Sequence, residues 1–119
     1  MESKEFNIAV VYGSMRSHRE GIKAARYVVR KLKGRGHHPV LVDPLDYELP
    51  FLNKMYKEYQ DGGAPAPMEK IAAIFREADG FLIVSGEYNH SLPPALKNLL
   101  DHFQQEYFFK PSAIATYSA

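Results

Sequence analysis

The sequence predicts an α/β fold in which helices cover both faces of a parallel β-sheet. Short apolar runs that suit buried strands alternate along the chain with longer segments whose apolar residues recur at helical spacing. Polar loops follow the first and third of these apolar runs. Strands that alternate with helices are typical of parallel sheets, because each crossover between parallel strands needs a connection long enough to hold a helix.

The first part of the chain is expected to form two strands and one helix. The near-continuous apolar run from Phe6 to Tyr12 predicts the first strand, buried on both faces. Between Ile22 and Leu32 the apolar residues fall on one helical face, and lysines and arginines occupy the others. Gly34 and Gly36 are typical of residues that end a helix, and the second strand is expected from Pro39 to Asp43.

The middle of the chain begins with a long irregular stretch. Residues from Pro44 to Pro67 are repeatedly interrupted by proline. Helical spacing returns between Met68 and Ala78, and the apolar run from Phe81 to Val84 predicts the third strand. This part of the sequence therefore predicts a loop, a helix and a buried strand.

A third helix and a fourth strand are expected at the end of the sequence. Prolines 93 and 94 suit the first helical turn, where a missing backbone N–H costs little, and Ser91 is a candidate N-cap. The run from Ala113 to Tyr117 predicts the fourth strand. Before it, apolar residues recur at helical spacing until Lys110-Pro111 stops the helix: Leu92, Leu96, Leu99, Leu100, Phe103 and Tyr107.

Right-handed crossovers restrict the order of the four strands, and we expect the order 2-1-3-4. The fold is then a flavodoxin-like three-layer α/β/α sandwich, with residues 1–119 in a single domain. In this order the first and third strands are neighbours whose connections leave on opposite faces. The loops after Tyr12 and Ser85 therefore flank the topological switch point, where ligands bind in such sheets.

Composition narrows the classes of function. The chain has a formal net charge of +1 and no cysteine. Disulfides, thiolate catalysis and cysteine-based metal sites are therefore excluded, and the balanced charge gives no reason to expect nucleic-acid binding. The five histidines lack metal-ligand spacing, so no metal site is expected. No apolar run approaches the roughly 20 residues that span a membrane, and we expect a soluble cytoplasmic protein.

The loop from Gly13 to Gly21 is a candidate phosphate site. It combines glycine, hydroxyl groups and arginines directly before a predicted helix, whose N-terminus favours an anion. It contains neither G-x-G-x-x-G nor G-x-x-x-x-G-K-[ST], so neither a dinucleotide nor a nucleoside triphosphate is indicated. A terminal phosphomonoester remains, provided that Glu20 points away from it. The alternative is an exposed polar loop with a capping serine.

The loop after the third strand is the richest in groups that can face a ligand. Residues 87–91 supply a carboxylate, a phenol, an amide, an imidazole and a hydroxyl. Tyr88 and Asn89 also suit a plain capped turn, in which Asn89 bonds its own backbone. If this loop and the first loop serve one ligand, both must face the same cleft.

Two motifs resemble the NADPH-dependent FMN reductase family. They are G-S-x-R at Gly13–Arg16 and E-Y-N-H-S-x-P-x-x-L-K-N-x-x-D at Glu87–Asp101. Members have a flavodoxin-like fold and include flavin-dependent quinone, azo-dye and chromate reductases, usually dimers or tetramers. The resemblance therefore implies FMN and NADPH as cofactors and a homodimer or homotetramer as the assembly.

The same resemblance implies which residues bind FMN. The phosphate would be held by residues of the first loop and of the helix start, namely Ser14, Arg16, Arg19, Gly21 and Ile22. The isoalloxazine ring would be lined by the loop after the third strand, namely Glu87, Tyr88, Asn89 and His90. A third wall of the flavin site follows the fourth strand in the family. In this sequence only Tyr117 and Ser118, at the end of that strand, could supply it.

Three departures from the family pattern bear on the site. Gly86 replaces a proline that often precedes the Glu-Tyr-Asn segment, and Arg19 stands where many relatives carry a small hydroxyl residue. Relatives also continue past the fourth strand with a glycine-rich loop, another helix and a fifth strand, whereas this sequence ends at Ala119. We therefore expect a truncated form whose fourth strand is an exposed sheet edge.

The resemblance implies an FMN-dependent NAD(P)H oxidoreductase. NADPH would pass hydride to FMN, and a small acceptor would then be reduced: a quinone, an azo compound, free flavin or a metal oxyanion. Because the flavin carries the chemistry, no catalytic side chain is expected. The alternative is a non-enzymatic FMN-binding electron carrier of flavodoxin type, which the near-neutral charge disfavours because flavodoxins are strongly acidic around the flavin.

Several other residues have more than one interpretation. The stretch from Phe51 to Tyr59 could close over the flavin, cover the sheet or contact a partner subunit, and the resemblance slightly favours the partner. The aromatic residues between positions 103 and 109 could join that surface or pack in the core. Lys97, Asn98 and Asp101 are as suited to pairing on the helix surface as to function. His102 is expected to face outward.

Overall fold

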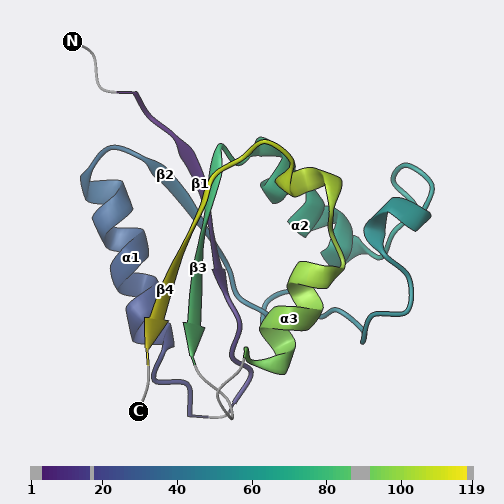
Figure 1. Cartoon of the computed structure of the whole chain (residues 1–119), viewed down its shortest axis with the longest axis horizontal. Coiled ribbons are helices and arrows are strands. Elements are labelled where there is room, and N and C mark those ends of the chain that lie inside the picture. The colour runs from purple at the N-terminus through teal and green to yellow at the C-terminus, as the bar shows by residue number, and fades with distance from the viewer. Residues whose placement is uncertain (1–3, 17, 87–91, 118–119) are drawn as a thin grey trace.

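The computed structural model of the chain describes residues 4–16, 18–86 and 92–117. These residues form a four-stranded parallel sheet in the order β2-β1-β3-β4, so the predicted fold class and strand order are confirmed. Figure 1 shows α1 on one face of the sheet and α2 and α3 on the other. The elements are β1 (Asn7–Tyr12), α1 (Ile22–Gly34), β2 (His38–Val42), α2 (Ala66–Glu77), β3 (Gly80–Gly86), α3 (Pro94–Asp101) and β4 (Ser112–Tyr117), with short 3-10 turns at Tyr56–Glu58 and Gln105–Tyr107.

The central strand β1 shows how the sequence builds the three layers. Successive side chains of a strand point to opposite faces, so an apolar run can enter two cores. Ala9 and Val11 pack with side chains of α2 and α3, whereas Val10 and Tyr12 pack with side chains of α1. All four are at most 1% exposed. The near-continuous apolar run therefore reflects burial on both faces of the sheet.

The register of the sheet brings the ends of β1 and β3 to the same edge. In this parallel pair Val10 lies opposite Leu82, and Tyr12 lies opposite Val84. The helices that follow these two strands, α1 and α3, cover opposite faces of the sheet (Figure 1). The switch point predicted from the strand order is therefore present between β1 and β3.

The third helix is shorter than the sequence predicts. α3 ends at Asp101, whereas the apolar spacing predicts helix as far as Lys110. Beyond its end the chain bends, and the rings of Phe103 and Tyr107 pack against Phe75 of α2 at centroid distances of 5.1 and 5.7 Å. The same core lies beneath the helix and the bend, so apolar residues continue at similar spacing after the helix has stopped.

Two residues near α3 also differ from the prediction. Leu92, expected in the apolar stripe, is 44% exposed because it precedes the first turn of the helix. His102, expected to face outward, is fully buried. It lies where the chain bends after α3, its Nδ1 donates to the carbonyl of Asn98 at 2.7 Å, and its own carbonyl accepts the Tyr56 N–H at 2.8 Å. The bend, which the periodicity does not reveal, turns His102 inward.

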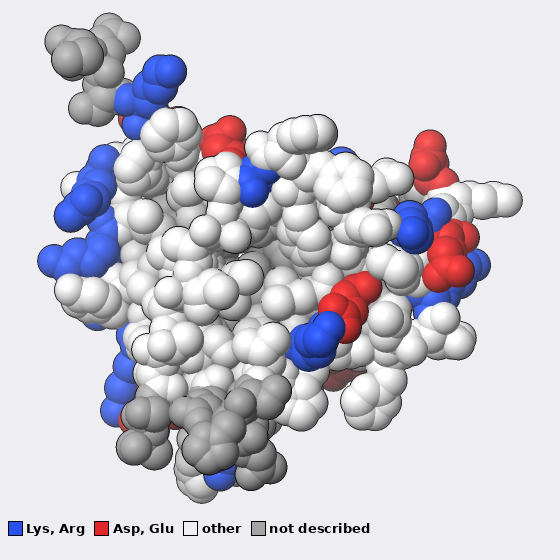
Figure 2. Space-filling view, viewed as in Figure 1, with Lys and Arg blue, Asp and Glu red and all other residues white. Residues whose placement is uncertain are grey.

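β4 is one edge of the sheet and pairs with β3. Its Ile114 side chain is 66% exposed, and the rings of Phe108 and Phe109 just before the strand are exposed as well. Figure 2 shows this side of the molecule, where charged side chains gather towards the margins and leave a wide uncharged area. The structure therefore has the exposed edge strand expected from the sequence.

None of the helices in the described ranges is both long enough and apolar enough to cross a membrane.

Candidate functional site

The loop after β1 lies directly against α3. Gly13 packs so closely on Leu96 that a Cβ atom at position 13 would overlap the Leu96 side chain and come within 2.8 Å of its Cα. Only glycine fits such a close approach without displacing the helix. The segment that leaves β1 and the helix that follows β3 therefore meet, as one shared ligand site requires.

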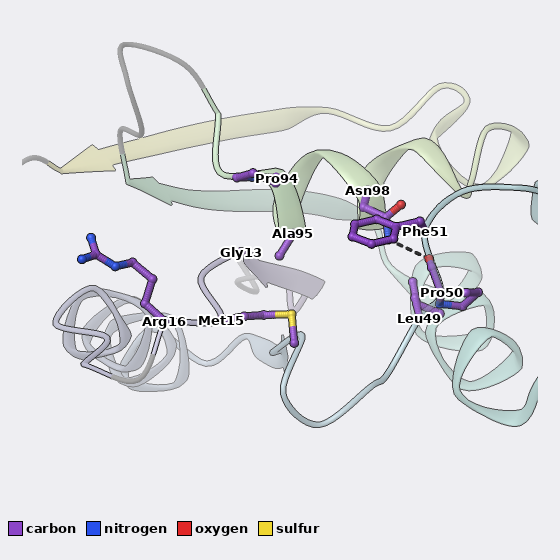
Figure 3. A pocket seen from close by; sticks show the side chains of 9 residues that line it. All are labelled: Gly13, Met15, Arg16, Leu49, Pro50, Phe51, Pro94, Ala95 and Asn98. Carbon is purple, nitrogen blue, oxygen red and sulfur yellow. Dashed lines mark hydrogen bonds between the residues drawn. The ribbon is translucent and has the colours of Figure 1, made fainter.

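A pocket of about 550 Å³ opens where these two segments meet the loop after β2. This volume lies within the range of small-molecule and cofactor sites. Figure 3 shows Arg16 at one end of the pocket and Phe51 and Asn98 at the other. The lining residues come from three segments that are distant in sequence: Gly13, Met15, Arg16, Leu49, Pro50, Phe51, Pro94, Ala95 and Asn98.

Ser14 and Arg16 take different places in the first loop. Ser14 is only 5% exposed, and its Oγ accepts the backbone N–H of Arg16 at 3.3 Å. This short-range bond shapes the turn. The Arg16 side chain is exposed and lines the pocket. Of the residues predicted to bind phosphate, Arg16 is therefore the one that reaches the described pocket.

The guanidinium of Arg19 forms a two-pronged ion pair with the carboxylate of Asp43, with one of the two N···O distances at 3.0 Å. It also donates to the carbonyl of Ser14 at 3.0 Å and lies 5.4 Å from the centre of the Tyr12 ring. The hydrogen bonds that Arg19 donates to the Asp43 carboxylate raise the pKa of Arg19, which stays charged at any ordinary pH. Arg19 thus ties the first loop to the end of β2.

Asp43 is a residue of this site that the sequence analysis missed. It follows β2 directly, is 5% exposed, and also accepts the Leu45 N–H at 3.0 Å. A single acidic residue after an apolar strand was the available signal, together with the unusual arginine at position 19. Neither residue, taken from the sequence alone, indicates that it pairs with the other.

Tyr117 and the start of α1 lie together on the other face of the sheet. Tyr117 and Ile22 belong to the cluster that packs between the sheet and α1. The Tyr117 ring fills the space beside Gly21, the N-cap of α1, and its hydroxyl lies 3.4 Å from that of Tyr12. The structure therefore brings Gly21, Ile22 and Tyr117 together, and none of the three lines the described pocket.

Glu20, which a phosphate in the first loop would repel, is turned to solvent. Its carboxylate pairs with Lys23 at 2.8 Å, and both side chains are about 80% exposed. The hydrogen bond from Lys23 lowers the pKa of Glu20. Glu20 therefore pairs with Lys23 in solvent, as a phosphate in the first loop would require.

The predicted contacts to the flavin ring at Glu87, Tyr88, Asn89 and His90 lie outside the described residues, as do Ser118 and the candidate cap Ser91. The described N-cap of α3 is Pro93, and Pro94 is the first helical residue. The two prolines therefore open the helix as the sequence predicts.

Asn98 is a polar residue of α3 whose role the sequence left open. Its Nδ2 donates to the carbonyl of Pro50 at 2.8 Å, and its Oδ1 accepts the N–H of Leu52 at 2.8 Å (Figure 3 shows the first of these bonds). The neighbouring Lys97 instead pairs with Asp101 at 2.7 Å along the helix. Of the three residues considered for surface pairing, two form that pair, and Asn98 holds the loop after β2.

Comparison with known proteins identifies the family. Residues 6–119 match the family model described as NADPH-dependent FMN reductase. The chain is 50% identical over 42 residues to a quinone reductase of Escherichia coli K12, an alignment covering 35% of this chain and 22% of the relative. It is 36% identical over 103 residues to a probable NADPH:quinone oxidoreductase 2 of Oryza sativa subsp. japonica, covering 82% of this chain and 47% of the relative. The chain thus spans less than half the length of either relative.

Solved structures show the same fold. The flavoenzyme NAD(P)H:(acceptor) oxidoreductase of Paracoccus denitrificans superposes with a TM-score of 0.75 at 24% sequence identity, covering 93% of this chain and 60% of that protein. At this identity the likeness concerns the fold. The family model, by contrast, covers nearly the whole chain from β1 to β4. The chain therefore belongs to the NADPH-dependent FMN reductase family.

Proposed function

We propose that this chain binds FMN at the edge where β1 and β3 end, and that it passes electrons from NADPH to a small organic acceptor of the quinone type. The observation that carries the proposal is the pocket with the arginine of the first loop, Arg16, at one end and the ring of Phe51 at the other. A phosphorylated aromatic cofactor needs a cation and an apolar wall within one site. Membership of the family supports the same ligand.

The residues of the first loop fit the phosphate of FMN. Arg16 carries a permanent charge and a planar set of donors that matches a phosphate. α1 begins directly after this loop, so the positive end of its dipole also favours an anion. Arg19 would contribute by holding the loop through Asp43. The proposal therefore keeps Ser14, Arg16, Arg19, Gly21 and Ile22 at the phosphate end of the cofactor.

The proposal keeps the ring end of the cofactor where the resemblance put it, at Glu87, Tyr88, Asn89 and His90, and keeps Tyr117 and Ser118 as the third wall of the site. FMN, when bound, supplies the hydride chemistry. The net reaction is quinone + NADPH + H⁺ → hydroquinone + NADP⁺. The described residues that line the pocket include no carboxylate and no imidazole, and most are apolar. Their part is to orient the reactants and exclude water, with Arg16 holding the negative charge.

An enzyme is favoured over a flavodoxin-type electron carrier. The relatives from Escherichia coli and Oryza sativa are named as a quinone reductase and a probable NADPH:quinone oxidoreductase. The net charge of +1 also differs from the strongly acidic surface by which an electron carrier would recognise a protein partner. We accordingly assign NADPH as the donor and a quinone, rather than a protein, as the acceptor.

The proposal extends to assembly and location. We propose a homodimer, supported by the exposed rings of Phe108 and Phe109 beside the edge strand. Phe103 and Tyr107, considered for the same surface, pack instead in the core. Light scattering on the purified protein should give twice the monomer mass. We place the reaction in the cytoplasm, where NADPH is available, and fractionation of cells expressing the chain tests this.

Steady-state kinetics test the proposed activity. The chain with added FMN should oxidise NADPH only when a quinone is supplied, and the rate should saturate with both substrates. A chain that binds FMN but oxidises NADPH no faster than free FMN with the same quinone would favour the electron carrier. The comparison with free FMN is the control, because flavin alone reacts slowly with NADPH.

A further inference from the structure

Asn98 fixes the backbone on both sides of Phe51. Its amide donates to the carbonyl of Pro50 and accepts the N–H of Leu52, both at 2.8 Å. These two backbone groups flank Phe51 directly, and they lie almost fifty residues before Asn98 in the sequence. A side chain with one acceptor and two donors is suited to bond both groups at once. The second turn of α3 therefore holds the loop after β2 in a defined conformation.

This arrangement displays the Phe51 side chain rather than burying it. The side chain is 88% exposed, although it lines the pocket together with Met15, Pro94 and Ala95. It does not cover the sheet, which was one of the roles considered for this stretch. A large aromatic side chain gains most by burial, so its exposure at a pocket is not explained by packing within the chain. A flat ring at such a place suits stacking on a flat ligand.

The chemistry of the lining points to the class of ligand. Around Phe51 the pocket is bounded by apolar side chains and by the amide of Asn98. The one charged side chain among the described lining residues, Arg16, stands at the far end (Figure 3). A tetrahedral oxyanion near Phe51 would lose its hydration without gaining a cation. A flat, uncharged aromatic ring would lose little and would gain contact with Phe51, Met15 and Leu49.

We propose that Asn98 is a positioning residue for Phe51, and that Phe51 selects flat aromatic acceptors, such as a quinone ring, over metal oxyanions. The inference rests on the proposed function, in which the acceptor enters this pocket beside the flavin. It gives one residue of the stretch after β2 a role: Phe51 would form a wall of the acceptor site.

Binding measured without NADPH tests the inference independently of turnover. Calorimetry of the chain with added FMN should show that 1,4-naphthoquinone binds and that Phe51→Ala weakens this binding about tenfold, a change of about 1.4 kcal/mol. Chromate binding should change less than twofold. An unchanged Kd for naphthoquinone, an equal loss for both acceptors, or no naphthoquinone binding to the wild type would overturn the inference.

Asn98→Leu tests the positioning role. The Leu52 amide, freed of its acceptor, should exchange its hydrogen at least roughly tenfold faster, and naphthoquinone binding should weaken about as much as in Phe51→Ala. The double variant should bind no more weakly than Phe51→Ala alone, because Asn98 acts through Phe51. Lys97→Ala, at the adjacent exposed position, is the matched control and should change none of these quantities.

The outcomes separate this inference from the proposed function. If naphthoquinone binds with the predicted dependence on Phe51 but NADPH is not oxidised, the proposed activity is wrong and the inference stands. If NADPH is oxidised with naphthoquinone while Phe51→Ala leaves its Kd unchanged, the inference is wrong. Additive losses in the double variant would show that Asn98 contributes to the pocket by another route and would overturn its positioning role.

Discussion

Arg19 and Asp43 form the least exposed ion pair of the described residues. Their side chains are 13% and 8% exposed, whereas the partners in the other described pairs are 39% to 81% exposed. Because Arg19 also donates to the Ser14 carbonyl, the pair connects the first loop with the end of β2. An ion pair in such a place matters to the fold as well as to the site.

Arg19→Met should lower the free energy of unfolding by about 2 to 3 kcal/mol, because the Asp43 carboxylate would stay buried without its charged partner. Urea denaturation measures the change. Adding Asp43→Asn should recover part of the loss, since the buried charge is then removed. Lys23→Met, which breaks the exposed pair with Glu20, is the control and should leave stability nearly unchanged. A fully stable Arg19→Met protein would show that the pair does not support the fold.

Tyr107 makes stability depend on pH in the alkaline range. Its hydroxyl donates to the Leu100 carbonyl at 2.8 Å, and burial raises its pKa above the ordinary value of 10.0. The folded chain thus holds this proton more tightly than the unfolded chain. The stabilisation is complete below pH 10 and is lost as the pH rises above it.

Tyr107→Phe should therefore cost about 1 kcal/mol at neutral pH through the lost hydrogen bond. Above pH 10 the variant should lose less stability per pH unit than the wild type, as followed by denaturation at a series of pH values. Tyr27→Phe, at an exposed position, is the control and should keep the wild-type dependence. Identical slopes for wild type and Tyr107→Phe would contradict the assignment.

Single residues also show where prediction from sequence stops. Arg16 and Arg19 are three positions apart and were predicted to do the same thing, yet one lines the pocket and the other pairs with Asp43. The difference depends on a carboxylate 24 positions away, which a local pattern does not include. In the same way, the backbone partners of Asn98 lie on a loop that the helix periodicity does not describe.

At the scale of elements, the packing of β4 on the start of α1 depends on Gly21. A Cβ atom at this position would overlap the hydroxyl end of the Tyr117 ring. Gly21→Ala should therefore destabilise the chain by about 1 to 3 kcal/mol through overpacking. Adding Tyr117→Leu, which removes the overlapping atoms, should restore part of the loss, and thermal unfolding measures both.

Gly34→Ala, at the other end of α1, is the control for Gly21→Ala. Nothing lies within 4 Å of a Cβ atom there, and alanine favours helix, so this variant should be at least as stable as the wild type. If Gly21→Ala were equally harmless, the close contact between α1 and Tyr117 would not exist in solution.

The elements themselves were predicted well where one periodicity describes one element. β1, α1, β2, α2, β3 and β4 appear where the apolar patterns place them, with ends shifted by one or two residues. α3 was predicted too long because Phe103 and Tyr107 keep the apolar spacing while packing from a bend. Spacing reports which residues reach the core, and it does not distinguish a helix from a turn that reaches the same core.

For the whole molecule, general rules left few possible strand orders, because crossovers between parallel strands are right-handed, and the order chosen among them is the observed one. The same rules predicted that the loops after β1 and β3 face one edge, and Gly13 against Leu96 shows that the first loop meets the helix that follows β3. Of the third segment of the pocket, residues 49–51, only Phe51 was considered for the site, and closing over the flavin was one of three roles left open for it. It comes from the irregular loop after β2, where no periodicity constrains the path of the chain.

The central claim is that this edge holds FMN by its phosphate, and titration of flavin fluorescence tests it most directly. FMN should bind the purified chain roughly 10- to 100-fold more tightly than riboflavin, which lacks the phosphate, as expected for charge-assisted hydrogen bonds. Arg16→Gln should remove most of this difference, and Arg26→Gln, exposed on α1, should preserve it. Equal affinities for FMN and riboflavin, or a difference that survives Arg16→Gln, would contradict the account.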